Sequence, residues 1–301
     1  YLPIKMDIEP TSKCNLKCHM CIVSTTGYKG EHLPYEDFTN ILDTQIGIIE
    51  LKIQGLGEPF LNKDFTKMVK YASNRGIWTR STTNATTLHL NENYKKVIDA
   101  NIGELQISVD GTQKNTYEKI RINADFELVK NNCKLINQYQ KEKNVLKTRM
   151  WTLLQKDNIE DLMHYPYFAK ELGFDRLTIS MDTHGWGDDE WSKKNAKKRV
   201  HLTQGDIDKL LKIADEINLD LTFWDISSKY TKKNLCQWPF SRCMISADLK
   251  VVPCCMISDP KIYTFGGNKN FHQIWFKDYV EFRENHINND IPSICKFCYE
   301  K

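Results

Sequence analysis

The sequence predicts an α/β protein: a partial parallel barrel of the (β/α)6 type, followed by a small C-terminal domain with a β-hairpin and a helix. Strand-like segments alternate with amphipathic segments of about 10–15 residues through the first three quarters of the chain. Strands separated in this way pair in parallel through right-handed crossovers. The alternation stops near Lys229, and six of the ten cysteines lie beyond that point.

The predicted strands are apolar or alternate apolar with polar residues, and several end at Pro, Gly or Asn. They cover residues 4–10, 48–55, 77–84, 104–111, 145–155, 174–180 and 219–226. The predicted helices have apolar residues at helical spacing, and Gly76 suits the C-terminal end of the second. They cover residues 34–45, 64–76, 91–101, 125–143, 159–173 and 203–217.

Two segments interrupt this pattern. Residues 182–200 form a long connection between a strand and a helix, and long loops are often functional. We expect this loop, with His184, Trp186 and Trp191, to act as a lid, although a surface insertion has the same signature. The polar segment 227–234 resembles a linker, so we predict two domains, 1–228 and 229–301.

Composition limits the function classes. The formal charge of +3 gives no argument for nucleic acid or an anionic membrane as partner. The mean hydropathy is −0.53, and no apolar run reaches the roughly 18 residues of a membrane span. No secretion leader is recognised, so we expect a cytoplasmic protein. Clustered cysteines in such a protein indicate metal binding rather than disulfides.

The first cysteine cluster follows the first predicted strand with the spacing Cys14-x3-Cys18-x2-Cys21. Ligands bind at the carboxyl ends of strands in parallel α/β folds. Three thiolates hold three irons of a [4Fe–4S] cluster and leave the fourth iron open for chemistry. A zinc site shared with Cys295 and Cys298 is the alternative, because tetrahedral sulfur sites suit both metals.

The segment "CNLKCHMC", within a chain of βα repeats, resembles the radical S-adenosylmethionine (SAM) superfamily. The resemblance continues in "GLGEPFLNKDF", in "TTNATTL" with Ala85 where glycine is usual, in "QISVDG" and in "YEKIR". It implies SAM as cofactor, bound to a [4Fe–4S] cluster. The residues it implies for SAM binding are Met20, Gly57, Glu58, Asn84, Ser108, Asp110 and Arg121. Taken singly, each of these residues is equally explained by packing, a turn or a solvated charge.

The tail resembles the SPASM or twitch extension of that superfamily, which holds an auxiliary [4Fe–4S] cluster between a β-hairpin and a helix. The resemblance implies four ligands, Cys236, Cys254, Cys295 and Cys298, and a hairpin turn at Asp248-Leu249 where the family usually has Asp-Gly. Cys255 either replaces Cys254 as ligand or stands free beside the active site. Cys243 is open to the same roles, and Cys133 is expected to be a buried hydrophobe.

In this superfamily the reduced cluster cleaves SAM, and the resulting 5′-deoxyadenosyl radical takes a hydrogen atom from the substrate. We expect oxidation of a sugar or aminocyclitol with the auxiliary cluster as electron acceptor, and an external donor of the flavodoxin or ferredoxin type. The alternative is a peptide epimerase or another peptide-modifying enzyme, in which Cys255 or Cys243 returns the hydrogen. A non-catalytic iron–sulfur or zinc module, acting as a nucleic-acid adaptor, is another alternative. It predicts basic patches interleaved with aromatic residues, and the formal charge of only +3 argues against it.

Overall fold

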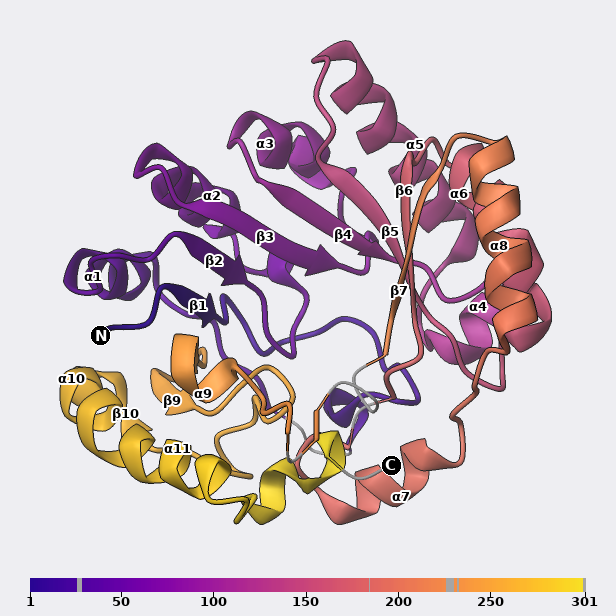
Figure 1. Cartoon of the computed structure of the whole chain (residues 1–301). Coiled ribbons are helices and arrows are strands. Elements are labelled where there is room, and N and C mark those ends of the chain that lie inside the picture. The colour runs from indigo at the N-terminus through magenta and orange to yellow at the C-terminus, as the bar shows by residue number, and fades with distance from the viewer. Residues whose placement is uncertain (26–28, 184, 226–229, 232, 300–301) are drawn as a thin grey trace.

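A single ten-stranded sheet organises the molecule (Figure 1), with the strand order β10-β9-β8-β1-β2-β3-β4-β5-β6-β7. The computed structural model describes residues 1–25, 29–183, 185–225, 230–231 and 233–299. The strands are β1 (Lys5–Ile8), β2 (Glu50–Ile53), β3 (Trp78–Thr83), β4 (Glu104–Ser108), β5 (Thr148–Leu153), β6 (Arg176–Ser180), β7 (Asp220–Trp224), β8 (Arg242–Ile245), β9 (Lys250–Val252) and β10 (Gly266–Gly267). Strands β1 to β7 are parallel to their neighbours, as the crossovers predict.

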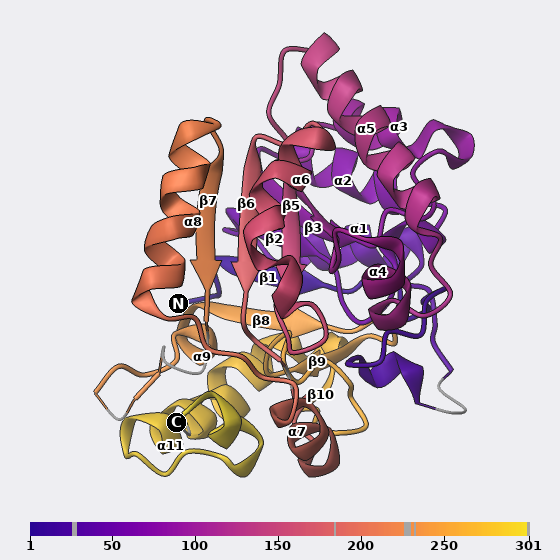
Figure 2. The same ribbon diagram turned by 90° about the vertical axis from the view of Figure 1, so that its right-hand side faces the viewer.

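Helices cover the outer face of this curved sheet, which stays open between β7 and β10 (Figures 1 and 2). They are α1 (Tyr35–Thr44), α2 (Phe65–Asn74), α3 (Asn93–Asp99), α4 (Lys114–Ile120), α5 (Phe126–Glu142), α6 (Tyr165–Glu171), α7 (Asp189–Ala196), α8 (Gln204–Glu216), α9 (Trp238–Ser241), α10 (Phe271–Gln273) and α11 (Tyr279–Ile287). A π-helical turn, Ile274–Asp278, joins α10 to α11. Among the described residues, no helix has the length and apolar character needed to cross a membrane.

Alternation along each strand separates the core from the barrel interior. In β1, Met6 and Ile8 belong to the hydrophobic core, whereas Asp7 between them does not. Because successive strand residues point to opposite faces, Asp7 lies on the inner face. Its direct register partner in β2, Lys52, shares that face. The interior is therefore polar and charged, and the apolar core lies between the sheet and its helices.

All seven predicted parallel strands are present, in an open and mostly parallel sheet, so the predicted partial barrel is confirmed. The predicted helix at 159–173 is instead a 3-10 turn, Ile159–His164, followed by α6. The segment 182–200, expected to be a loop, contains α7. The side chain of Asp188 caps this helix by accepting a hydrogen bond from the backbone of Trp191 at 2.9 Å.

The C-terminal hairpin continues the barrel sheet. Strand β8 pairs in parallel with β1, and β9 pairs with β8 in antiparallel orientation. Leu249 occupies the turn with φ +62°, the left-handed conformation that glycine usually supplies at this point of the family's hairpin. The predicted domain boundary at 228/229 falls outside the described residues, and the division into two domains stays a prediction.

Candidate functional site

The three-cysteine loop begins six residues after β1, at the carboxyl edge of the sheet. Two backbone hydrogen bonds hold it against the end of α4, from Lys17 N to the carbonyl of Ile122 (3.0 Å) and from His19 N to the carbonyl of Ile120 (3.2 Å). Cys14, Cys18 and Cys21 surround a small apolar cluster of Leu16, Met20 and Ile120. The loop thus presents its three thiols together, in a largely apolar setting.

The electrostatics of these thiols fit a cationic cofactor. The pKa of Cys14 is raised to about 11 and that of Cys21 to about 12, mainly by burial and to a smaller extent by the neighbouring thiols. Three thiolates here would repel one another, so they need positive charge from a metal to be stable. Among the described residues, no three His, Cys, Asp or Glu side chains form a site for a single metal ion. The zinc alternative also requires Cys295 and Cys298, which instead line a pocket with Cys236 and Cys254. A [4Fe–4S] cluster, in which each cysteine binds a different iron, therefore fits the three-cysteine loop better.

Gly57 allows the end of β2 to approach this loop. A Cβ atom at Gly57 would lie 2.4 Å from the carbonyl oxygens of Thr11 and Lys13, which is far too close. The next residue, Glu58, donates its backbone N–H to the carbonyl of Lys13 at 2.9 Å. Its buried carboxylate accepts hydrogen bonds from the hydroxyl of Thr83 (2.6 Å) and the backbone N–H of Asn84 (2.7 Å). Burial raises the pKa of Glu58 to about 7.

Asn84, at the end of β3, reaches the cysteine loop directly. Its amide nitrogen donates to Oδ1 of Asn15 at 3.0 Å and lies 4.0 Å from the sulfur of Cys14. The following residue, Ala85, has φ +63°, so the turn requires the left-handed conformation that glycine usually provides. Gly57, Glu58 and Asn84 therefore meet at one place beside the loop.

Asp110 and Arg121, which the resemblance assigns separately to SAM, are bonded to each other. Nε and Nη2 of Arg121 lie 2.8 and 2.7 Å from Oδ2 of Asp110, and both side chains are buried. The other oxygen of Asp110 accepts the backbone N–H of Leu153 at 2.8 Å. This pair ties α4 to the ends of β4 and β5, next to Ser108, which is also buried. The third guanidinium nitrogen of Arg121, Nη1, takes no part in the salt bridge with Asp110.

The predicted lid segment covers the cysteine loop. Nε1 of Trp186 and the side-chain amide of Asn195 both donate to the carbonyl of Met20, at 3.1 and 3.0 Å. Trp186 and Trp191 also pack against an apolar cluster that touches Cys14 and Cys21. His184, also expected in the lid, lies outside the described residues. No sequence pattern predicted the contact of Asn195 with Met20.

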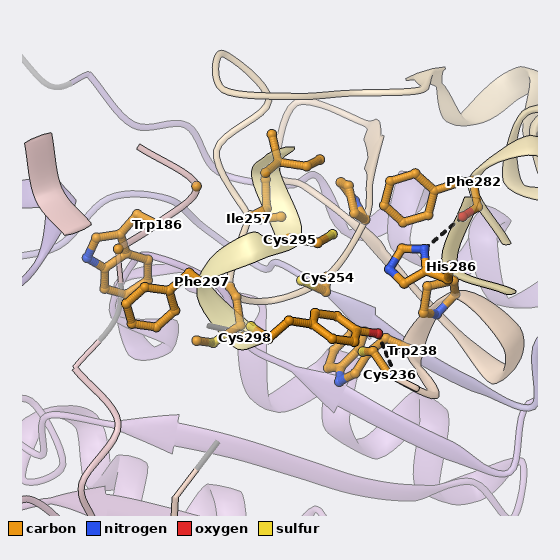
Figure 3. Close-up of a pocket in the computed structure, with 17 residues that line it drawn as sticks. Trp186, Cys236, Trp238, Cys254, Ile257, Phe282, His286, Cys295, Phe297 and Cys298 are labelled. Carbon is orange, nitrogen blue, oxygen red and sulfur yellow. Dashed lines mark hydrogen bonds between the residues drawn. The ribbon is translucent and has the colours of Figure 1, made fainter. Parts of the chain in front are cut away.

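The four tail cysteines of the resemblance line one pocket, Cys236, Cys254, Cys295 and Cys298 (Figure 3). The pocket is walled by aromatic and apolar residues, among them Trp238, Ile257 and Phe297. Burial raises the pKa of Cys295 to about 12 and that of Cys254 well above its usual value, and the neighbouring thiols add to the shift at Cys254. As at the first loop, the four thiolates together need a cationic partner.

His286 adds a nitrogen to the same pocket. Its Nδ1 lies 2.8 Å from the carbonyl of Phe282, and since a carbonyl only accepts, Nδ1 carries the proton. Nε2 is buried and has no hydrogen-bond partner among the described residues. In Figure 3 this nitrogen is on the side of the ring that faces the cysteines. This unprotonated nitrogen is therefore a buried acceptor to which no described residue donates, beside four thiols, and such a group needs an explanation. No sequence pattern singled out His286.

Cys255 and Cys243 have different surroundings. Cys255 is partly accessible, and burial raises the pKa of its thiol. The charged groups that act on that thiol are Lys52, Asp7, Arg242 and Asp182, which come from the inner face of the sheet and the end of β6. Cys255 therefore lies near charged groups of the barrel interior, and it also packs against the apolar cluster that the four tail cysteines touch. Cys243 is fully buried in the core on the outer face of β8, so we retain only Cys255 as a candidate hydrogen donor. Cys133 is a core residue, as expected.

Comparison with known proteins places these features in a family. Residues 8–165, just over half of the chain, match the radical SAM superfamily. The chain is 24% identical over 278 residues to the PqqA peptide cyclase of Bradyrhizobium diazoefficiens, covering 84% of this chain and 67% of that protein. It is 22% identical over 191 residues to the mycofactocin maturase MftC of Mycolicibacterium smegmatis, covering 63% of this chain and 47% of the maturase.

Solved structures share the fold. Streptococcus suis SuiB bound to S-adenosylmethionine superposes with a TM-score of 0.71 at 17% identity, covering 94% of this chain and 68% of SuiB. A second SuiB structure, bound to the precursor peptide SuiA, gives a TM-score of 0.68, also at 17% identity, covering 94% of this chain and 67% of SuiB.

Proposed function

This chain belongs to the radical SAM superfamily, and we propose that it modifies a peptide substrate inside the partial barrel. Two cysteine sites at one edge of the sheet, with the Cys255 thiol near charged groups of the barrel interior, support this proposal. Peptide modification takes precedence over the expected oxidation of a sugar or aminocyclitol, because one relative is a peptide cyclase by name and SuiB has been solved with a precursor peptide.

We assign the three-cysteine loop to the SAM-binding [4Fe–4S] cluster and the four tail cysteines to an auxiliary cluster. When bound, SAM and its reduced cluster supply a 5′-deoxyadenosyl radical that abstracts a hydrogen atom from the substrate. Glu58 and Asn84 meet beside Cys14, where they are placed to fix the amino-acid part of SAM. The paired Asp110 and Arg121 hold α4, and with it the loop, in position.

We assign the exclusion of water to the lid, the segment 182–200 that contains α7. Trp186 and Asn195 close over the loop through the carbonyl of Met20 and keep bulk water from the reacting groups. Since this carbonyl accepts both bonds, the lid and the loop are positioned relative to each other by one atom. We therefore expect Met20 to contribute through its backbone as well as through its buried side chain.

Cys255 is the proposed hydrogen donor. Its S–H bond breaks as a new C–H bond forms at the substrate carbon, which leaves a thiyl radical. One electron from the external flavodoxin- or ferredoxin-type donor and one proton from solvent restore the thiol before the next turnover. Asp7 and Lys52 lie close enough to act on this thiol and supply the polar surroundings in which a proton can move. With this thiol in use, the product keeps the mass of the substrate.

The test is coexpression of the enzyme with each small open reading frame adjacent to its gene, followed by mass spectrometry of the peptides and chiral amino-acid analysis. We expect one peptide to change in stereochemistry at unchanged mass, and a Cys14→Ala enzyme to leave it unchanged. Conversion of a sugar or aminocyclitol by the purified enzyme, with every peptide untouched, would contradict the proposal.

A further inference from the structure

A group of lysines lies around the outer side of α7, directly above the three-cysteine loop. We define the α7 basic surface as Lys119, Lys156, Lys193, Lys194, Lys197 and Lys198. We propose that this surface docks an acidic electron-donor protein, a flavodoxin or ferredoxin, that reduces the cluster of the loop. The inference rests on the assignment of that loop to the SAM-binding cluster.

The helix places these charges opposite the loop. Asn195 is fully buried and donates to Met20, which lies between Cys18 and Cys21. Lys193 and Lys197, two positions to either side, are about 200° away around the helix, and both are exposed. An α-helix is about 10–12 Å thick with its side chains. A protein seated on these lysines would therefore be separated from the loop by little more than one helix.

Salt bridges connect the α7 basic surface to the three-cysteine loop. Asp157 is paired with Lys119 at 2.9 Å and with Lys198 at 3.4 Å, and it lies 3.6 Å from Nε2 of His19, a residue of the loop. The neighbouring Lys156 is exposed and donates its backbone N–H to the carbonyl of Lys198 at 2.9 Å. The surface thus reaches the loop at His19 through Asp157, a carboxylate that pairs with two of its lysines.

The acids of α7 lie at its other end. Asp188 caps the helix, and Asp189 and Glu190 occupy the first turn, whereas the lysines occupy the last turn and the residues after it. Burial lowers the pKa of Lys194, and the nearby charge of Lys198 lowers it further. Lys194 lies 3.8 Å over the Trp191 ring and Lys198 pairs with Asp157 at 3.4 Å, so both positive charges are held at this surface. Like charges held close together favour a partner of opposite charge.

An acidic electron donor is such a partner. The cluster must receive an electron from outside for each cleavage of SAM, and complementary charge speeds encounter by about 10- to 1,000-fold at low ionic strength. The chain as a whole has a formal charge of only +3, so overall charge does not provide this attraction. A local basic surface over the cluster attracts the acidic donor and also holds it close to the cluster.

The experiment compares two reductants of the same reconstituted enzyme. The test variant carries Lys156→Glu, Lys193→Glu and Lys197→Glu, and 5′-deoxyadenosine formation is measured with reduced flavodoxin and with dithionite. We expect the flavodoxin-driven rate at low salt to fall by at least about tenfold, and the dithionite-driven rate to change by less than about twofold. Added salt should slow the wild-type reaction with flavodoxin and have little effect on the variant.

The matched control carries Lys141→Glu, Lys209→Glu and Lys212→Glu, three exposed lysines on α5 and α8 with the same total charge change. We expect this control to behave as wild type with both reductants. Equal losses in the two reductant assays, as for an acidic peptide substrate or a damaged lid, would overturn the docking site, and so would an unchanged flavodoxin rate. Absence of cleavage by wild type with dithionite would instead reject the cluster assignment.

Discussion

At the residue scale, the pair Cys254 and Cys255 shows how adjacent thiols acquire different surroundings. The backbone of Cys254 forms an isolated bridge with Ile257, and its side chain lines the auxiliary pocket. Cys255 is influenced by charges of the barrel interior. Cys254 opens a tight turn, in which the backbone N–H of Ile257 donates to the carbonyl of Cys254 at 3.1 Å, and Cys255 is the next residue of that turn. The turn gives the two adjacent thiols different neighbours, so we assign one to the auxiliary site and the other to the substrate.

We predict that Cys255→Ala cleaves SAM but fails to complete the reaction. The variant keeps both proposed clusters, since Cys255 is outside both ligand sets, so 5′-deoxyadenosine should still form at a rate within about threefold of wild type. Wild-type turnover in D₂O should place one deuterium on the product carbon, because the thiol hydrogen exchanges with solvent. The measurement is mass spectrometry of the product together with 5′-deoxyadenosine. A Cys255→Ala enzyme that still forms the deuterated product would exclude the thiol as donor.

At the element scale, the carboxyl ends of β1 and β2 depend on close contacts that only small or polar residues permit. Gly57→Ala introduces a Cβ atom 2.4 Å from two backbone oxygens, so the cysteine loop must shift. We expect a loss of unfolding free energy of about 1–3 kcal/mol and a reduced yield of the first cluster. Urea unfolding and iron analysis measure both effects. Gly267→Ala is the control, since a Cβ atom there meets nothing within 4 Å, and it should lie within about 0.5 kcal/mol of wild type.

Glu9 connects the hairpin to the barrel and makes that connection sensitive to pH. Its carboxylate accepts the backbone N–H of Leu56 (2.6 Å) and of Ala247 (3.0 Å), and burial raises its pKa from about 4.5 to about 7. The folded chain therefore holds this proton more tightly than the unfolded chain does. The resulting stabilisation is complete below about pH 4.5 and is lost as the pH rises through about 7.

We expect the unfolding free energy of the metal-free wild type to fall between pH 5.5 and pH 8, by at most about 3 kcal/mol from this group. Glu9→Gln should flatten that dependence, because the variant has no proton to lose at this position. Urea unfolding at several pH values measures the slope. Identical slopes for the two proteins would show that Glu9 does not titrate in this range.

At the scale of the whole molecule, local sequence patterns predicted the parallel strands and the three-cysteine loop. The strands follow from apolar alternation, and the three-cysteine loop follows from spacing within eight residues. Helix α7 was missed because its lysine-rich sequence carries no apolar stripe, although Asp188 followed by two acids is a start signal. The contacts of Asn195 with Met20 and of His286 with the tail cysteines join residues distant in sequence. No local pattern encodes such contacts.

The two proposed clusters belong to one sheet, because β8 of the C-terminal hairpin pairs with β1 of the barrel. Anaerobically reconstituted enzyme should contain about eight irons, four from each site. Replacing Cys14, Cys18 and Cys21 by alanine should lower this to about four and abolish 5′-deoxyadenosine formation. Replacing Cys295 and Cys298 instead should also leave about four irons, but SAM cleavage should persist, because the first loop does not draw on tail cysteines.

The shared sheet gives this comparison a structural control. Both sets of replacements leave the strand pairing of β1 with β8 intact, so far-ultraviolet circular dichroism of the two variants should match wild type. Iron and sulfide analysis, with electron paramagnetic resonance of the reduced proteins, would then report each site separately. About four irons in wild type, all lost with the first three cysteines, would show that the tail pocket holds no cluster. In that case the four tail thiols and His286 would form a pocket without a cluster beside the barrel.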